Sequence, residues 1–189
     1  MRIIVYLLLI SPFYLFAQKK SLSNAALERT KYYVIYTPNY IGIEYPNGDV
    51  PEGTGVCTDV IIRAYRNAFS FDFQKAIHED MKINFTKYPS KKIWGASGPD
   101  KNIDHRRTQN MECYLTRKGA KLPVTDNPND YKPGDIVFYG HIASGHVGIV
   151  VDKYVDGRPK IVHNIGAGPK CEDFLFESPI TGHYRFIPE

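Results

Sequence analysis

The sequence is short of several residue types and patterns, and each shortage narrows the class of protein. Its 189 residues include only 3 cysteines, and no CxxC or HxxxH spacing occurs among the cysteines and histidines. A zinc site therefore has little support, and we expect no metal and no cofactor. Basic residues form only short clusters, and the formal net charge is +4. Proteins that bind nucleic acid usually carry a longer basic stripe, so no nucleic-acid partner is expected.

Long hydrophobic runs are also scarce, and the clearest one lies at the start of the chain. Arg2 precedes an apolar run over residues 3–10, which Pro12 interrupts soon afterwards. A membrane span needs about 20 apolar residues, whereas a secretory signal needs a shorter run and a small residue at the cleavage site. We expect residues 1–17, ending at Ala17, to be a cleaved signal peptide, which leaves no stable membrane span. An uncleaved anchor is the alternative.

Residues 18–189 have the length of one domain, and 43% of the chain is hydrophobic, enough for a core. We expect a monomer. Apolar spacing predicts helices first and strands later, an order typical of an α+β fold with an antiparallel sheet. The expected helices cover 21–31, a segment starting at Cys57, 70–84 and 108–118. The expected strands cover 135–139, 146–152, 160–164 and 183–187, with an extended segment at 32–45.

The stretch around Cys57 organises the rest of the sequence. Gly55 precedes it, and apolar or small residues follow it with the spacing of one helix face. Asp59, in the first turn, can cap free N–H groups. A thiol at that point feels the positive end of the helix, which favours the thiolate. The alternative is a core cysteine, since free cysteine is among the most buried residue types.

Two histidines on the expected strands suggest a use for the thiol. His146 opens its strand after a glycine-containing loop, where a side chain can face a cleft and act as a general base. A third polar group must then orient the imidazole. His163 and Asn164, on the next strand, are the candidates for that role. The Cys57 N–H, at a helix start, can contribute to an oxyanion hole.

Strand register raises a difficulty for His163. A two-residue turn at Asp156-Gly157 pairs His163 with about Val150, four residues along the strand from His146. That separation is about 13 Å at ~3.3 Å per residue. Contact between the two histidines requires another register or a bulge, for which Gly148 is a candidate position. Asn164 therefore stays as the substitute.

Segments of the second half resemble the NlpC-type cysteine peptidases, papain-like enzymes that cut amide bonds in bacterial cell-wall peptides. The matching signatures are GDIVF at 134–138, HVGIV at 146–150 and IVH at 161–163. Most of the expected mature chain is more similar to a bacterial family catalogued as domain of unknown function 1287. That likeness lies in GVCTDV, NIDHRR, GDIV, HVGIV, VHNIG and ITGHYRF.

The resemblance implies a papain-like core, in which the helix that bears the nucleophile packs on an antiparallel β-sheet. It assigns Cys57 as nucleophile, His146 as base and His163 as the orienting group. It also implies a peptidase or amidase whose substrate is a cell-wall peptide or another amide, and the expected signal peptide makes the protein secreted or periplasmic. Two alternatives stay open: a non-catalytic wall-binding module of the same fold, and a thiol acyl-transfer or thioester-cleaving enzyme.

Other polar residues are candidates for substrate binding. Better-known relatives carry Asp-Cys-Ser-Gly at the nucleophile, whereas here Asp59 follows Cys57 by two residues. Asp59 then caps the helix, supports Arg106 or Arg107, or touches substrate. The resemblance favours a role for Asp104, Arg106 and Arg107 in binding a peptide carboxylate, against the alternative of a solvated charged loop. Asn164 joins this group if His163 is the orienting residue.

An odd number of cysteines leaves at least one thiol unpaired. Cys113 and Cys171 can bridge and leave Cys57 free, or all three can be reduced. The sequence does not choose between these states.

Overall fold

The computed structural model describes residues 21–140 and 145–188. The expected signal peptide at 1–17 lies outside these residues. The helices are α1 (Leu22–Arg29), α2 (Cys57–Phe69), α3 (Phe73–Asn84), α4 (Ser90–Trp94) and α5 (Thr108–Arg117), with single turns of 3-10 helix at Phe85–Lys87, Asp104–Arg106 and Pro128–Asp130. The strands are β1 (Ile35–Tyr36), β2 (Thr54–Gly55), β3 (Lys121–Leu122), β4 (Ile136–Tyr139), β5 (His146–Val155), β6 (Arg158–His163), β7 (Lys170–Glu172) and β8 (Ile180–Tyr184).

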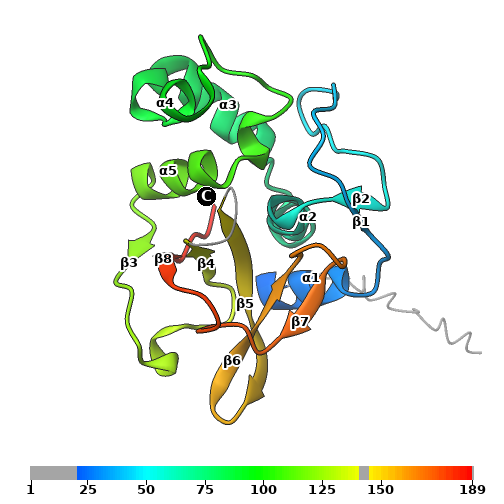
Figure 1. Ribbon diagram of the computed structural model, residues 1–189, viewed down its shortest axis with the longest axis vertical. Coiled ribbons are helices and arrows are strands. Elements are labelled where there is room, and N and C mark those ends of the chain that lie inside the picture. The colour runs from blue at the N-terminus through cyan, green and yellow to red at the C-terminus, as the bar shows by residue number, and fades with distance from the viewer. Residues whose placement is uncertain (1–20, 141–144, 189) are drawn as a thin grey trace, which may run out of the picture.

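Helices and sheet are segregated along the chain, and the expected α+β class is confirmed (Figure 1). Six strands form one antiparallel sheet in the order β3-β8-β4-β5-β6-β7. Strands β1 and β2 form a separate parallel pair. Helices α1 and α2 contact β5, and α5 contacts β8. The helix that carries Cys57 therefore packs on the antiparallel sheet, as the resemblance implies.

Helix α2 follows from its local sequence. Its apolar residues recur with a 3.6-residue period, and nine of its residues are buried. At its start, the Val56 N–H donates to Asp59 Oδ2 at 2.7 Å, so Asp59 caps the helix. At its end, Ser70 takes the left-handed conformation, with φ of 55°. These local signals place Cys57 at the first helical residue.

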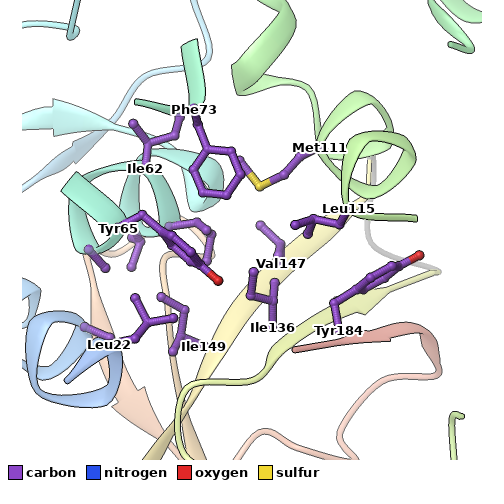
Figure 2. Close-up of a cluster of buried hydrophobic side chains, with 14 of the residues drawn as sticks. Leu22, Ile62, Tyr65, Phe73, Met111, Leu115, Ile136, Val147, Ile149 and Tyr184 are labelled. Carbon is purple, nitrogen blue, oxygen red and sulfur yellow. The ribbon is translucent and has the colours of Figure 1, made fainter. Parts of the chain in front are cut away.

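The main core lies between the helices and one face of the sheet. Figure 2 shows side chains of the helices and of the strands meeting there, among them Tyr65, Met111, Ile136, Val147 and Ile149. A second, smaller cluster covers the other face of the sheet and includes Tyr131, Val137, Tyr139, Val150, Ile161 and Leu175. The first six residues of β5 are buried, which explains why that strand reads as a nearly continuous apolar run.

Several elements differ from those expected. The segment at 32–45 contains only the two-residue strand β1, because only Ile35 and Tyr36 find a partner strand, at Thr54 and Gly55. Helix α4 and strand β7 have no clear sequence signal, and β8 begins at Ile180 rather than at 183. Short strands of this kind form because a neighbouring strand offers free hydrogen-bonding groups, which no local pattern reveals.

The β5–β6 hairpin has the expected turn but a shifted register. Asp156 and Gly157 both have positive φ, 47° and 78°, as a tight hairpin turn requires. Beyond the turn, Tyr154 pairs with Pro159, whereas Val150 pairs with Ile161. Four steps along β5 (150 to 154) thus match two along β6 (159 to 161). The irregularity lies between Val150 and Tyr154, not at Gly148.

Among the residues that the structure describes, no helix is both long and apolar enough to cross a membrane.

Candidate active site

Cys57 is the first residue of α2, and 4% of it is exposed. Backbone N–H groups of two elements act to lower the pKa of its thiol: Val147 on β5, and Thr58 and Cys57 itself at the helix start. Burial raises the pKa of the thiol to about 12, against the lowering by those N–H groups, and the charge of Asp59 adds to the rise. The direction is opposite to that expected from the helix terminus alone, because loss of water outweighs the N–H groups.

The two candidate histidines meet. Nε2 of His146 lies 2.7 Å from Nδ1 of His163, and both side chains are buried. The shifted register makes this contact, since it moves His163 two residues closer to His146 than a plain turn does. Gly148 leaves the space they need: a Cβ there would lie 3.2 Å from the His163 Cβ. The structure therefore removes the difficulty that register raised for His163.

Glu172, on β7, extends this contact and was not singled out in the sequence. Its Oε2 lies 3.0 Å from Nε2 of His163. His146, His163 and Glu172, here called the histidine relay, thus form a continuous hydrogen-bonded series across three neighbouring strands. The three-residue strand β7 carries no strong apolar pattern, so only its pairing with β6 brings Glu172 to the histidines.

The thiol lies at the start of β5, where the histidine relay begins. The Val147 backbone N–H, which lowers the pKa of the thiol, belongs to the residue that follows His146. Within residues 21–140 and 145–188, no hydrogen bond joins the Cys57 sulfur to either histidine ring. Hydrogen bonds of catalytic groups are often long or absent before substrate binds. Thiol and relay thus adjoin neighbouring residues at the start of β5, without a hydrogen bond between them. Val147 packs in the core that contains Cys57, whereas Tyr139, which contacts the His146 ring, belongs to the cluster on the other face of the sheet.

Two cavities adjoin the thiol and the relay. One, of about 340 Å³, is lined by Cys57; the other, of about 370 Å³, is lined by His146. Thr108, Gln109 and Gly145 line both cavities. The cavity at Cys57 is also lined by aromatic and cationic side chains (Tyr36, Tyr40, Trp94, Arg106 and Arg107) and by aliphatic ones (Pro38, Val56 and Ile103). It is concave, partly apolar and carries a few polar groups, as small-molecule sites usually do.

Arg106 lines the cavity at Cys57 but directs its guanidinium hydrogen bonds to Asp59 and to backbone carbonyl groups. Arg106 Nε donates to Asp59 Oδ1 at 3.0 Å, and the two side chains are 2% and 4% exposed. Arg106 also donates to the carbonyl oxygens of Thr37 and Asn39. These contacts fasten the segment before β2 and the turn at Asp104–Arg106 to the start of α2. A role of either residue toward substrate stays a prediction.

Arg107 is more open to the cavity at Cys57. Its guanidinium carbon lies 4.1 Å from the centre of the Trp94 ring, a cation–π contact. Its only described ion pair is with Asp104, at 3.3 Å. Asp104 itself is buried, and burial raises the pKa of its carboxyl group to about 6. Arg107 is therefore the cavity cation with the most hydrogen-bonding capacity to spare.

Asn164, the alternative to His163 as the orienting group, uses its side chain to bond its own loop. Its Oδ1 accepts from the Gly166 N–H at 3.1 Å, and its buried Nδ2 has no partner among the described residues. It makes no hydrogen bond to His146 there. The geometry favours His163 over Asn164 as the orienting group, while the catalytic role stays a prediction.

Cys57, Cys113 and Cys171 are all free thiols, so the bridge between Cys113 and Cys171 does not form in this structure. Within the described part of the chain, no three His, Cys, Asp or Glu side chains are grouped as metal ligands.

Comparisons with known proteins identify the family of the chain. Residues 23–186 match the model of a family described as domain of unknown function DUF1287. The chain is 44% identical over 170 residues to "Uncharacterized protein YijF" of Escherichia coli (strain K12), covering 88% of this chain and 81% of that protein.

A solved structure from Staphylococcus aureus, described as similar to a lipoprotein of the NLP/P60 family, is 16% identical. That match covers 90% of this chain but only 63% of the solved one, and its TM-score of 0.25 is too low to argue from. The extent of the first two matches is what decides the family. The chain belongs to the family described as domain of unknown function DUF1287.

Proposed function

We propose that the protein is an exported cysteine hydrolase that cleaves amide bonds, with bacterial cell-wall peptides as its substrates. One observation carries the proposal: the histidine relay begins at His146, next to Val147, whose backbone N–H lowers the pKa of the Cys57 thiol. A nucleophile, a base and a group that orients the base are the parts that thiol catalysis needs. The cell-wall substrate and the export rest on the NlpC resemblance and on the expected signal peptide at 1–17.

In the proposed reaction, the Cys57 proton moves to His146 as the sulfur bonds to the carbonyl carbon of the substrate. The C–N bond then breaks, and the imidazolium returns the proton to the departing amine. Water next adds to the thioester, the C–S bond breaks, and the thiol and a carboxylic acid are released. The Cys57 backbone N–H, at the first helical position, has no partner within the helix and supports the negative oxygen formed in each step.

The resting protein holds both reacting groups neutral. Burial and the nearby His163 lower the pKa of His146 to about 3, while burial raises that of Cys57 to about 12. The proton therefore stays on sulfur until a substrate is in place. General-base removal of the proton during attack, rather than a resting thiolate–imidazolium pair, fits these two pKa values.

The walls of the Cys57 cavity support a peptide that bears a carboxylate. Arg107 presents donors that suit a carboxylate, and Trp94, Tyr36 and Tyr40 offer apolar surface for the rest of a peptide. We assign carboxylate binding to Arg107. Asp59, Arg106 and Asp104 act by holding that wall in place, through the contacts described above.

The buried, neutral thiol favours one alternative, a wall-binding module that has the fold but no catalysis. A thiol acyl-transferase or thioesterase would use the same groups on a different bond. Product analysis separates these functions, since a binding module releases nothing and an acyl-transferase leaves the acyl group on an acceptor other than water.

The test is digestion of purified cell-wall peptide fragments by the mature protein, with products weighed by mass spectrometry. The wild type should release fragments that differ from the substrate by one water, and Cys57→Ala should release none while keeping its fold. Cys113→Ser is the matched control, because that thiol lies on α5 and its hydrogen bond among the described residues is to the Lys87 carbonyl oxygen. Turnover by Cys57→Ala, or binding without turnover by the wild type, would overturn the proposal.

A further inference from the structure

We propose that Glu172 is a positioning residue that selects the tautomer of His146 and so directs its basic nitrogen to the thiol. The inference rests on the proposed function and names a further member of the same site. It starts from two distances, 3.0 Å between Glu172 Oε2 and His163 Nε2, and 2.7 Å between His163 Nδ1 and His146 Nε2.

The positions of the hydrogen atoms in the histidine relay follow from which groups can donate a hydrogen bond and which can only accept one. An ionised carboxylate only accepts, so Nε2 of His163 carries the hydrogen that faces Glu172. A neutral imidazole has one N–H, which leaves Nδ1 of His163 as an acceptor. Nε2 of His146 must then donate to it. The lone pair of His146 is thereby on Nδ1, the ring nitrogen that has no hydrogen bond to any described residue.

Without Glu172 the opposite arrangement competes. His163 can carry its hydrogen on Nδ1 and donate to Nε2 of His146, at the same distance between the rings. His146 then holds its hydrogen on Nδ1 and has no lone pair left for the thiol proton. A histidine of the wrong tautomer is a poor general base even where its position is unchanged. The carboxylate of Glu172 decides between the two arrangements.

Neighbouring aromatic side chains hold the His146 and His163 rings in place. Glu172 is therefore needed to select the tautomer of His146, not to position the rings. The Phe174 ring lies 4.3 Å from the His163 ring, centre to centre, and 5.9 Å from that of His146. The Tyr139 ring, on β4, packs against the His146 ring with 5.9 Å between the ring centres. Glu172 is not needed to fill this space, since its side chain is 42% exposed and reaches His163 from the edge strand β7.

The charged groups near His163 are consistent with a positioning role for Glu172. Lys170, opposite His163 in the β6–β7 register, repels a proton on that ring, whereas Glu172 attracts one. Asp173, next to Glu172, points its carboxylate at Arg158 instead, with 2.6 Å between Oδ2 and Nη2. Two adjacent carboxylates thus differ in one respect that matters here, contact with His163.

That difference supplies a matched control. Glu172→Ala removes the acceptor, and Glu172→Gln keeps an oxygen that can accept from His163 but loses the charge. Asp173→Ala removes a neighbouring charge and its pair with Arg158, but no contact with His163. We expect Glu172→Ala to lower kcat roughly 10- to 100-fold, by analogy with the range for partners that orient metal-binding histidines, with little change in KM. Glu172→Gln should fall between it and the wild type, and Asp173→Ala should match the wild type.

The tautomer itself is read by 15N NMR of the imidazole nitrogens, in protein carrying Cys57→Ala so that no reaction interferes. His146 should bear its hydrogen on Nε2 with Glu172 present, and Glu172→Ala should shift population toward Nδ1–H. A hydrogen on Nδ1 of His146 with Glu172 in place, or an unchanged tautomer in Glu172→Ala, would overturn the inference. Failure to cleave any wall fragment would instead count against the proposed function, because the NMR result needs no substrate.

Discussion

Asp59 and Arg106, 47 residues apart in the chain, form an ion pair with 3.0 Å between Oδ1 and Nε and with both side chains almost fully buried. Thr58 strengthens the same junction by donating its hydroxyl to the Arg106 carbonyl oxygen at 2.9 Å. The pair fixes the first turn of α2, and therefore Cys57, against the loop that lines the cavity.

Arg106→Leu should destabilise the protein by about 3–5 kcal/mol, because it leaves the Asp59 carboxylate buried without its partner. Urea unfolding followed by circular dichroism measures this change. Arg117→Leu is the control, since it breaks the partly exposed pair with Asp80, and its loss should be clearly smaller. Equal losses in the two variants would mean that the buried pair has no special structural role.

Arg107→Gln should raise KM roughly tenfold or more for peptides with a free carboxylate, since a hydrogen bond to a charged group is lost. It should leave kcat nearly unchanged, because Arg107 is not part of the histidine relay. Steady-state kinetics with a carboxylate peptide and its amide measures the effect. Lys101→Gln removes a nearby cation that does not line the Cys57 cavity and should change neither constant. An equal KM for acid and amide peptides in the wild type would contradict the role given to Arg107.

Gly148→Ala should destabilise the protein by about 1–3 kcal/mol and lower kcat, since overpacking forces its neighbours to move. The new Cβ would lie 2.4 Å from Cγ2 of Ile161 and 3.2 Å from the His163 Cβ. Thermal unfolding and kinetics measure the two effects. Gly98→Ala, where no atom lies within 4 Å of the added carbon, is the control and should be nearly neutral. Relief of the loss by a second change, Ile161→Ala, would confirm the cause.

Stability should fall as the pH is lowered from about 6.5 toward 3. Burial lowers the pKa of His105 and of His146 to about 3, so the unfolded chain binds protons in this window that the folded protein does not. Each such group contributes a slope of about 1.4 kcal/mol per pH unit. Asp104 acts in the opposite sense between its usual pKa of 3.8 and about 6, because burial raises its pKa.

Urea unfolding at several pH values tests these signs. His105→Asn should flatten the dependence, and Asp104→Asn should steepen it. A slope that is the same in the wild type and in His105→Asn would show that His105 is not held neutral by burial.

Alkylation of Cys57 by iodoacetamide should be slow at neutral pH and should rise continuously toward pH 10, because burial raises the pKa of the thiol. Mass spectrometry of the modified peptide gives the rate at each pH. A rate that levels off below pH 7 would indicate a resting thiolate, and with it a reaction that begins from an ion pair.

Local patterns in the sequence determined a large part of this protein. The helix that starts at Cys57, the tight turn at Asp156-Gly157 and the antiparallel strands follow from side-chain periodicity and backbone preference, which act over a few residues. The segments GVCTDV, NIDHRR, GDIV, HVGIV, VHNIG and ITGHYRF resemble the DUF1287 family, and the family comparison confirmed that resemblance.

The tertiary structure alone decided how those residues meet. The register shift between Val150 and Tyr154 brings His163 to His146, and the pairing of β7 with β6 brings Glu172 to His163. Burial reverses the pKa shift expected for Cys57 at a helix start. The strand register, the strand pairing and the burial of Cys57 each depend on residues far away in the chain. A local pattern in the sequence therefore cannot predict them.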